Sequence, residues 1–92
     1  MPTANARHIL VSTEEECLKL KSEIEGGADF ATIAKANSSC PSRMQGGDLG
    51  TFAKGQMVRE FDEAVFSAPI GQCVGPVKTQ FGFHLIEVTK RW

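Results

Sequence analysis

The chain has 92 residues, enough for one domain with a modest core, and its ten Lys and Arg side chains nearly balance eleven Asp and Glu side chains. The resulting net charge of −1 argues against a basic surface for nucleic acid or a polybasic membrane anchor. No apolar run approaches the roughly eighteen residues of a membrane-spanning helix and no secretory pattern is present, so we expect one cytoplasmic domain, residues 1–92, without nucleic-acid or membrane partners.

The first elements predicted along the chain are a strand and a helix. Residues 7–11, RHILV, form a short aliphatic run that is typical of a buried strand. Thr13 and Glu16 have the spacing of a capping box, which predicts a helix that ends at Gly26 and Gly27. The apolar stripe of this helix consists of Cys17, Leu20 and Ile24.

A second, shorter helix and a long loop follow. Asp29 has the properties of an N-cap, and the spacing of apolar residues predicts a helix over residues 30–36. Residues 38–55 are rich in Ser, Gly and Pro, which indicates a loop. Within this loop we expect one brief extended piece at residues 49–52.

The last third of the chain predicts a helix and two strands. Helical spacing returns over residues 57–66 and stops before Pro69, because the residue before a proline avoids the α region. Strands are predicted at residues 75–79 and 83–88, with a tight connection at residues 80–82.

The predicted order β-α-α-β-α-β-β, which ends in a hairpin, indicates an α+β domain with a small, largely antiparallel sheet. On the last strand, alternation places His84, Ile86 and Val88 on one face, and the side chains between them on the other.

Four side chains combine reactive groups with apolar or constrained surroundings: His8, Cys40, Thr79 and His84. The ordinary interpretation of a lone buried histidine is a core imidazole that is hydrogen-bonded to backbone. Two histidines in the first and last strands change this, because neighbouring strands would let the rings bond to each other or to Thr79. We expect both rings to be at least half buried.

Cys40 has two interpretations. A free cysteine often behaves as a small apolar side chain, as we expect for Cys17, but Cys40 lies in a polar loop. A histidine could activate it as a nucleophile, as in Cys-His hydrolases, although the chain is short for such a fold. The three cysteines, which include Cys73, cannot all pair within one chain, and this favours a reducing compartment.

No metal or cofactor is expected. A zinc site formed by His8, Cys40 and His84 is conceivable from residue types, but no two of them have the close spacing of a structural zinc site. A separate apolar group consists of Leu49, Met57, Phe61 and Phe81, in which the flexible Met57 thioether is suited to line an adaptable pocket.

Four segments together resemble one known family. In order and spacing, RHILV, GADFATIAKANSSCPS, GGDLGTFAKGQMVREFDEAVFS and GPVKTQFGFHLIEV resemble the parvulin-type peptidyl-prolyl cis/trans isomerases. The likeness covers essentially the whole chain and is closest to the minimal, single-domain bacterial form.

The resemblance implies a four-stranded, largely antiparallel sheet surrounded by three or four helices. It also implies a site in which His8, His84, Thr79 and Cys40 lie beside a hydrophobic proline pocket, with Cys40 in the place of a cysteine or aspartate. The pocket would be formed by Leu49, Met57 and Phe61, with Phe81 at its rim.

One segment departs from the family members that prefer phosphorylated Ser-Pro or Thr-Pro. Those members carry a basic loop after the first strand, whereas this chain has Glu14, Glu15 and Glu16 there. Three carboxylates repel a phosphate, so we expect no phosphate-directed specificity.

The resemblance therefore predicts a monomeric isomerase that acts on X-Pro bonds of unfolded or flexible proline-containing polypeptides without a cofactor. The chief alternative is a non-catalytic peptide-binding chaperone module that uses the same apolar groove, and a Cys-His hydrolase comes third.

Overall fold

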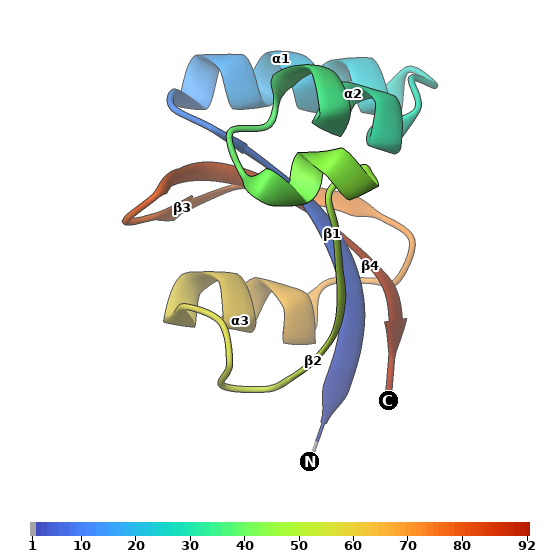
Figure 1. The fold of residues 1–92 in the computed structure, drawn as a ribbon, viewed down its shortest axis with the longest axis vertical. Helices are drawn as coiled ribbons and strands as arrows, with labels where there is room; N and C mark the ends of the chain where they lie inside the picture. Colours follow the sequence, from blue (N-terminus) through green and yellow to red (C-terminus); the bar gives the residue numbers. More distant parts are fainter. Residues whose placement is uncertain (1) are drawn as a thin grey trace.

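The computed structural model of the chain describes residues 2–92 as four strands, three α-helices and one 3₁₀ helix (Figure 1). Their bounds are β1 (Thr3–Val11), α1 (Glu14–Glu25), α2 (Phe30–Asn37), η1 (Pro41–Gln45), β2 (Asp48–Ala53), α3 (Arg59–Ser67), β3 (Cys73–Thr79) and β4 (Gly82–Arg91). The predicted α+β class and the order β-α-α-β-α-β-β are confirmed. None of these helices is long and apolar enough to cross a membrane.

The four strands form one sheet in the order β2-β1-β4-β3, with every neighbouring pair antiparallel. The first and last strands are therefore the central pair. In their register, His8 lies opposite Ile86, and Leu10 lies opposite His84. This register brings the two histidines, which are far apart in the sequence, onto neighbouring positions of the sheet.

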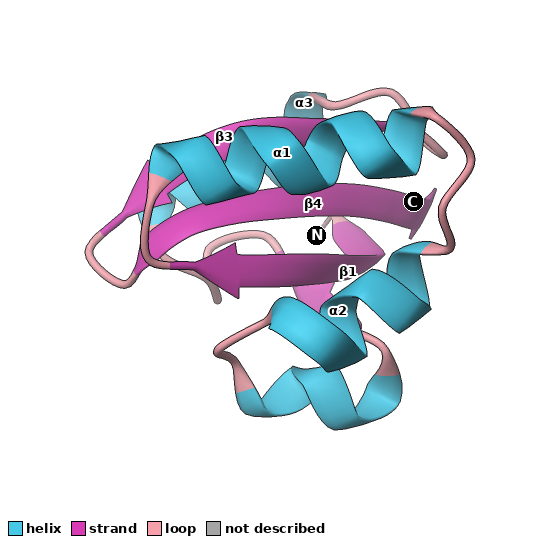
Figure 2. Ribbon diagram, turned by 90° about the horizontal axis from the view of Figure 1, so that it is seen from above, coloured by secondary structure: helices cyan, strands magenta, loops and turns pink. Residues whose placement is uncertain are grey.

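The helices divide between the two faces of the sheet, with α1 and α2 on one face and α3 on the other (Figures 1 and 2). The core on the α3 side contains Ala4, Ala6, Phe52, Phe61, Val65, Ala68, Ile86 and Val88. The core on the other side contains Ile9, Val11, Cys17, Leu20, Phe30, Ala34, Cys73 and Leu85. The predicted alternation of β4 is confirmed, and His84 shares the α3 face with Ile86 and Val88.

Capping bonds confirm the predicted starts of the first two helices, whereas α3 begins at Arg59, two residues later than predicted and without a side-chain cap. Thr13 Oγ1 accepts a hydrogen bond from the backbone N–H of Glu16 at 3.2 Å, and Asp29 Oδ2 accepts one from Thr32 at 3.0 Å. Each bond satisfies a backbone donor that the first turn of a helix leaves unpaired.

The segment predicted as a loop over residues 38–55 contains more structure than expected. Pro41 begins η1, where its fixed φ and missing N–H are tolerated, and the bond from Arg43 N–H to the Cys40 carbonyl, 3.0 Å, closes the first turn. The expected extended piece at residues 49–52 is the middle of the longer strand β2.

The other strands are also longer than predicted. β1 begins at Thr3, β3 at Cys73, and β4 continues to Arg91. The added residues of β1 include Ala4 and Ala6, whose small side chains give a weak strand pattern. Backbone pairing with β2 and β4 extends the strand regardless of that pattern.

Gly47 fixes the close approach of β2 to β1. Its carbonyl accepts a hydrogen bond from His8 N–H at 2.9 Å, and its φ is +87°. A Cβ atom at this position would lie 2.3 Å from the His8 carbonyl oxygen. Glycine is therefore required here by both the backbone conformation and the contact with the strand that carries His8.

We expect Gly47→Ala to lower the free energy of unfolding by about 2 kcal/mol or more, because the strained φ and the steric overlap with His8 add together. Urea unfolding measures this loss. Gly50→Ala is the matched control, since Gly50 also has a positive φ, +71°, but no atom lies within 4 Å of the added Cβ. Equal losses in the two variants would show that the contact with β1 relaxes without cost.

Candidate active site

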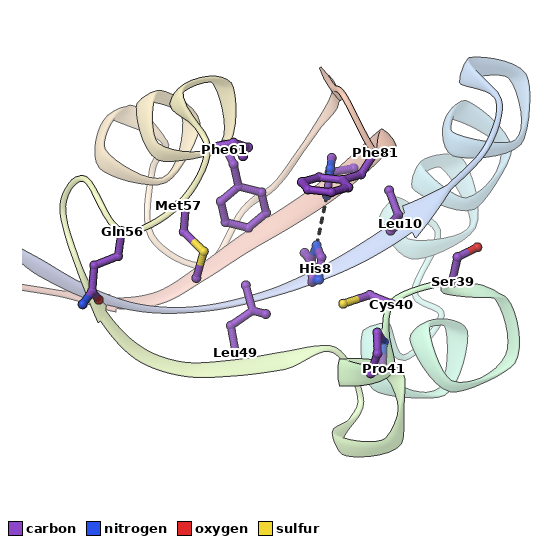
Figure 3. A pocket seen from close by; sticks show the side chains of 12 residues that line it. His8, Leu10, Ser39, Cys40, Pro41, Leu49, Gln56, Met57, Phe61 and Phe81 are labelled. Carbon is purple, nitrogen blue, oxygen red and sulfur yellow. Dashed lines mark hydrogen bonds between the residues drawn. The ribbon is translucent and has the colours of Figure 1, made fainter.

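A cavity of about 450 Å³ opens on the α3 face of the sheet, between α3 and the segment that leads into η1 (Figure 3). Twelve side chains line it: His8, Leu10, Ser39, Cys40, Pro41, Leu49, Gln56, Met57, Val58, Phe61, Phe81 and His84. Its volume lies within the usual range for small-ligand and peptide side-chain pockets, roughly 300 to 1,000 Å³.

The structure brings together all eight residues that the sequence singled out. Seven of them line the cavity, and the eighth, Thr79, hydrogen-bonds to His84. Both histidines are almost fully buried, as expected, with 5% and 3% of their surfaces exposed. Phe81 lies at the rim and is 61% exposed.

Five lining residues were not anticipated: Leu10, Ser39, Pro41, Gln56 and Val58. Leu10 could have been found, because it is two positions after His8 on the same strand and faces the same side. Gln56 and Val58 flank Met57. Ser39 and Pro41 flank Cys40, in a segment whose 3₁₀ geometry the sequence did not reveal.

Three buried polar side chains, His8, His84 and Thr79, form one continuous hydrogen-bond chain. His8 Nδ1 lies 3.0 Å from His84 Nδ1, and the two rings are stacked with their centroids 5.2 Å apart. His84 Nε2 lies 2.7 Å from Thr79 Oγ1, which also accepts a bond from Phe81 N–H at 3.1 Å. The chain thus connects the β3–β4 turn with the centre of the sheet.

The direction of this chain depends on the tautomers of the two rings. Thr79 Oγ1 accepts from Phe81 N–H, and its bond with His84 Nε2 runs in the direction that the protonation of that ring sets. In either direction one histidine Nδ1 donates and the other accepts. His8 Nε2 is buried and has no hydrogen-bond partner among residues 2–92. An unpaired ring nitrogen therefore lies on a residue that lines the cavity.

Burial keeps both rings neutral at physiological pH. Burial, and to a lesser extent the neighbouring His84, lowers the pKa of His8 from its ordinary value of 6.5 to about 4. Burial also lowers the pKa of His84. The hydrogen bond between the rings requires at least one of them to be neutral, because one Nδ1 must accept.

The opposite wall of the cavity is apolar. Phe61 is 3% exposed and presents its ring edge-to-face to both histidines, with centroid distances of 5.4 Å in each case. Leu49 and Met57 pack against the same core cluster. This wall excludes water from the faces of the two rings.

Cys40 lies at the end of the cavity opposite Met57. It is partly exposed, it is not disulfide-bonded, and Figure 3 shows its sulfur pointing toward the cavity interior. Its backbone N–H donates to Ser38 Oγ, a buried hydroxyl that also accepts from Leu10 N–H. Ser38 therefore fastens the Cys40 segment to β1. Within residues 2–92, no group of three or more His, Cys, Asp or Glu side chains has the arrangement of a metal site.

Comparison with known proteins identifies the family. The family model described as the PPIC-type PPIASE domain matches residues 1–92. The chain belongs to this PPIase family. Among curated relatives, the foldase protein PrsA of Geobacillus sp. (strain WCH70) is 44% identical over 91 residues, which cover 98% of this chain and 33% of that relative. The PPIase chain thus spans about a third of the length of the curated relatives it matches.

Solved structures agree with this assignment. The peptidylprolyl isomerase PrsA from Bacillus anthracis aligns with a TM-score of 0.97 and 40% identity over 99% of this chain and 42% of that one. NmPin, the parvulin of Nitrosopumilus maritimus, aligns with a TM-score of 0.87 and 34% identity over 98% of both chains. The predicted parvulin-type fold, a four-stranded antiparallel sheet with its helices, is confirmed.

We expect the PPIase domain to lose stability as the pH falls from about 6.5 to about 4. In this window an unfolded histidine binds a proton and the buried His8 does not, so protonation favours the unfolded state. Above the ordinary pKa of 6.5, His8 is neutral in both states and this effect vanishes. The loss from His8 is on the order of 3 kcal/mol, and His84 acts in the same direction.

Urea unfolding across this pH range measures the effect. His8→Leu is the comparison, because it removes one titrating ring while the carboxylates remain. The variant is expected to be less stable at neutral pH, since His84 Nδ1 loses its hydrogen-bond partner, but to show a shallower pH dependence. If the free energy of unfolding depends on pH equally in the variant and the wild type, His8 does not have a lowered pKa.

Proposed function

We propose that this protein catalyses cis/trans isomerisation of X-Pro peptide bonds in flexible or unfolded polypeptide segments. The observation that supports this most directly is the apolar cavity whose floor is a neutral, buried Thr79–His84–His8 hydrogen-bond chain beside the Cys40 thiol.

The reaction suits a site of this kind. Resonance places a barrier of roughly 18 to 20 kcal/mol on rotation about the peptide bond, while the cis and trans forms of X-Pro differ by only about 0.5 to 1 kcal/mol. A catalyst therefore needs neither cofactor nor energy source. It needs to bind the twisted amide better than the planar one. Twisting reduces the amide dipole, so an apolar cavity favours the twisted state.

Leu49, Met57 and Phe61 are assigned to hold the proline ring. They form the apolar wall, and the edge-to-face contacts of Phe61 with both histidines fix its orientation. Holding the ring immobilises one side of the rotating bond. Phe81, exposed at the rim, is assigned to contact the substrate chain as it enters.

The carbonyl side of the bond would then rotate near Cys40 and the histidines. We assign Cys40 a non-covalent role, because isomerisation breaks no bond and an acyl adduct is unnecessary. His8, His84 and Thr79 are assigned to hold a fixed, uncharged polar floor under the rotating group, with His8 Nε2 as the unpaired ring nitrogen.

The substrate is proposed to carry no phosphate before the proline. β1 leads directly into α1, whose first turn contains Glu14, Glu15 and Glu16. These carboxylates lie at the end of the strand that carries His8 and Leu10, and they disfavour a dianionic group there.

A reducing, cytoplasmic setting and a monomeric state complete the proposal. Cys17, Cys40 and Cys73 are all free thiols, which suits a reducing compartment. Size-exclusion chromatography with light scattering tests the monomer, and localisation of the tagged protein in its own cells tests the compartment. A stable dimer or an exported protein would overturn the respective part.

A protease-coupled assay on short X-Pro peptides, repeated without protease by NMR exchange, tests the activity. Faster interconversion supports the isomerase. Saturable peptide binding without faster interconversion favours the non-catalytic chaperone module. Cleavage without added protease favours a Cys-His hydrolase.

We expect Phe61→Ala and Met57→Ala each to lower kcat/KM at least about tenfold, because a hydrophobic pocket loses roughly this factor per missing apolar group. Phe66→Ala is the matched control: Phe66 lies on the same helix and packs against Phe52 and the same core, but is not among the residues that line the cavity. Thermal unfolding confirms that the variants are folded at the assay temperature. Equal losses in Phe61→Ala and Phe66→Ala would indicate a general effect of destabilisation.

Cys40→Ser separates the two possible roles of the thiol. A non-covalent role predicts a partial loss of kcat/KM, about tenfold or less, whereas loss of a covalent nucleophile typically costs more than about 10³-fold. Alkylation gives an independent measurement, because burial raises the pKa of Cys17 and of Cys73 to about 11 and leaves Cys40 as the accessible thiol. Iodoacetamide should abolish the isomerase activity of the wild type and leave the activity of Cys40→Ala unchanged.

A further inference from the structure

The connection between β2 and α3, residues 54–58, supplies one wall of the cavity. Gln56 and Met57 line the cavity from this connection, and Figure 3 shows Met57 reaching into it beside Phe61. Gly55, in the middle of the connection, has a φ of +93°. No atom lies within 4 Å of the position that a Gly55 Cβ would occupy, so neighbouring side chains do not confine this glycine.

Hydrogen bonds hold the connection at its two sides. On the β2 side, Gln56 Oε1 accepts from Ala53 N–H at 2.7 Å and Lys54 N–H donates to the Pro2 carbonyl at 3.0 Å. On the α3 side, Gly55 N–H donates to Asp62 Oδ1 at 2.8 Å. Besides the first helical bond of α3, from Asp62 N–H to the Val58 carbonyl at 2.9 Å, this bond joins the connection to α3.

Asp62 is a charged residue in an unusual place. It is only 9% exposed, although it lies on the short surface helix α3 directly after Phe61, and no lysine or arginine forms a salt bridge with it within residues 2–92. A buried carboxylate without an ion-pair partner needs strong hydrogen bonds. The Gly55 N–H and the N-terminal end of the α3 dipole provide compensation.

From this geometry we infer that Asp62 is a positioning residue for the site: its carboxylate holds Gly55 and thereby fixes the wall that Gln56 and Met57 present to the proline ring. The inference rests on the proposed isomerase function for its kinetic consequence. Asp62 itself is not among the residues that line the cavity, so it acts through the connection. Asp62 links the connection to the helix that carries Phe61. The side chains of Met57 and Phe61 therefore keep a constant separation.

Asp62→Ala removes the acceptor and tests the inference. We expect kcat/KM to fall about five- to tenfold, because displacement of a positioning group by on the order of 1 Å can cost up to about 100-fold. The fall should appear mainly in KM as the wall becomes mobile. Amide hydrogen exchange at Gly55 should accelerate, while the amides of the central strands remain protected.

Asp62→Asn is the conservative variant. Its side-chain oxygen can still accept from Gly55 N–H, so it should restore most of the activity and of the Gly55 protection. Asp29→Ala is the matched control, because it also removes a carboxylate that accepts from a backbone N–H in a helix cap, but at α2 and away from the cavity. It should lower stability without changing KM.

Three results would overturn the inference. The first is an unchanged kcat/KM in folded Asp62→Ala. The second is a loss of kcat/KM in Asp62→Asn as large as that in Asp62→Ala. The third is a rise in KM in Asp29→Ala, which would show that loss of stability alone raises KM. If Asp62→Ala does not fold, the wild type decides: a Gly55 amide that exchanges at the rate of an unstructured one removes the anchor on which the inference depends.

Failure of the isomerase proposal is distinguishable from failure of this inference. If the wild type binds proline peptides without accelerating isomerisation, the peptide dissociation constant replaces kcat/KM as the readout. Asp62→Ala should still weaken binding, and Asp62→Asn should still restore it. A dissociation constant that is the same in all three proteins would overturn the inference independently of catalysis.

Discussion

The pairing of β1 with β4 is the constraint on which the rest of this molecule depends. It makes the first and last strands the centre of the sheet and sets His8 beside His84 on one face. β2 then adds to the free edge of β1, and β3 to the free edge of β4. The edge strands bring the Cys40 segment and Thr79 to the same face from opposite sides. A one-residue slip of either central strand would turn its histidine to the opposite face and separate the two rings.

The two faces of the sheet differ in how they are covered. The face under α1 and α2 is closed by aliphatic side chains, and its two cysteines are buried. The other face is covered by α3 alone, a helix of nine residues, and the uncovered part of the sheet becomes the cavity floor. Hydrogen bonds in sequence from Phe81 N–H to His8 stabilise the buried polar groups on that floor, with His8 Nε2 as the exception. Burial and polarity coexist there through one continuous network.

Local signals and strand alternation were sufficient to predict much of this from the sequence. Thr13 and Asp29 carry cap chemistry that depends only on neighbouring residues, and both caps are present. The facing of His84 followed from the period of two in a strand. What could not be predicted depends on tertiary contacts: η1 replaces an expected loop, and it places Ser39 and Pro41 in the lining of the cavity. The neutral state of the histidines likewise required the three-dimensional burial that only the fold provides.

The central bond of the site joins residues 76 positions apart in the chain, His8 and His84. During synthesis on the ribosome, the first strand emerges long before its partner exists, so the polar floor cannot assemble on an incomplete chain. The cavity therefore needs the pairing of β4 with β1, a contact between distant parts of the sequence whose loop closure is costly. A nascent copy of this domain has no complete cavity until β4 has been synthesised.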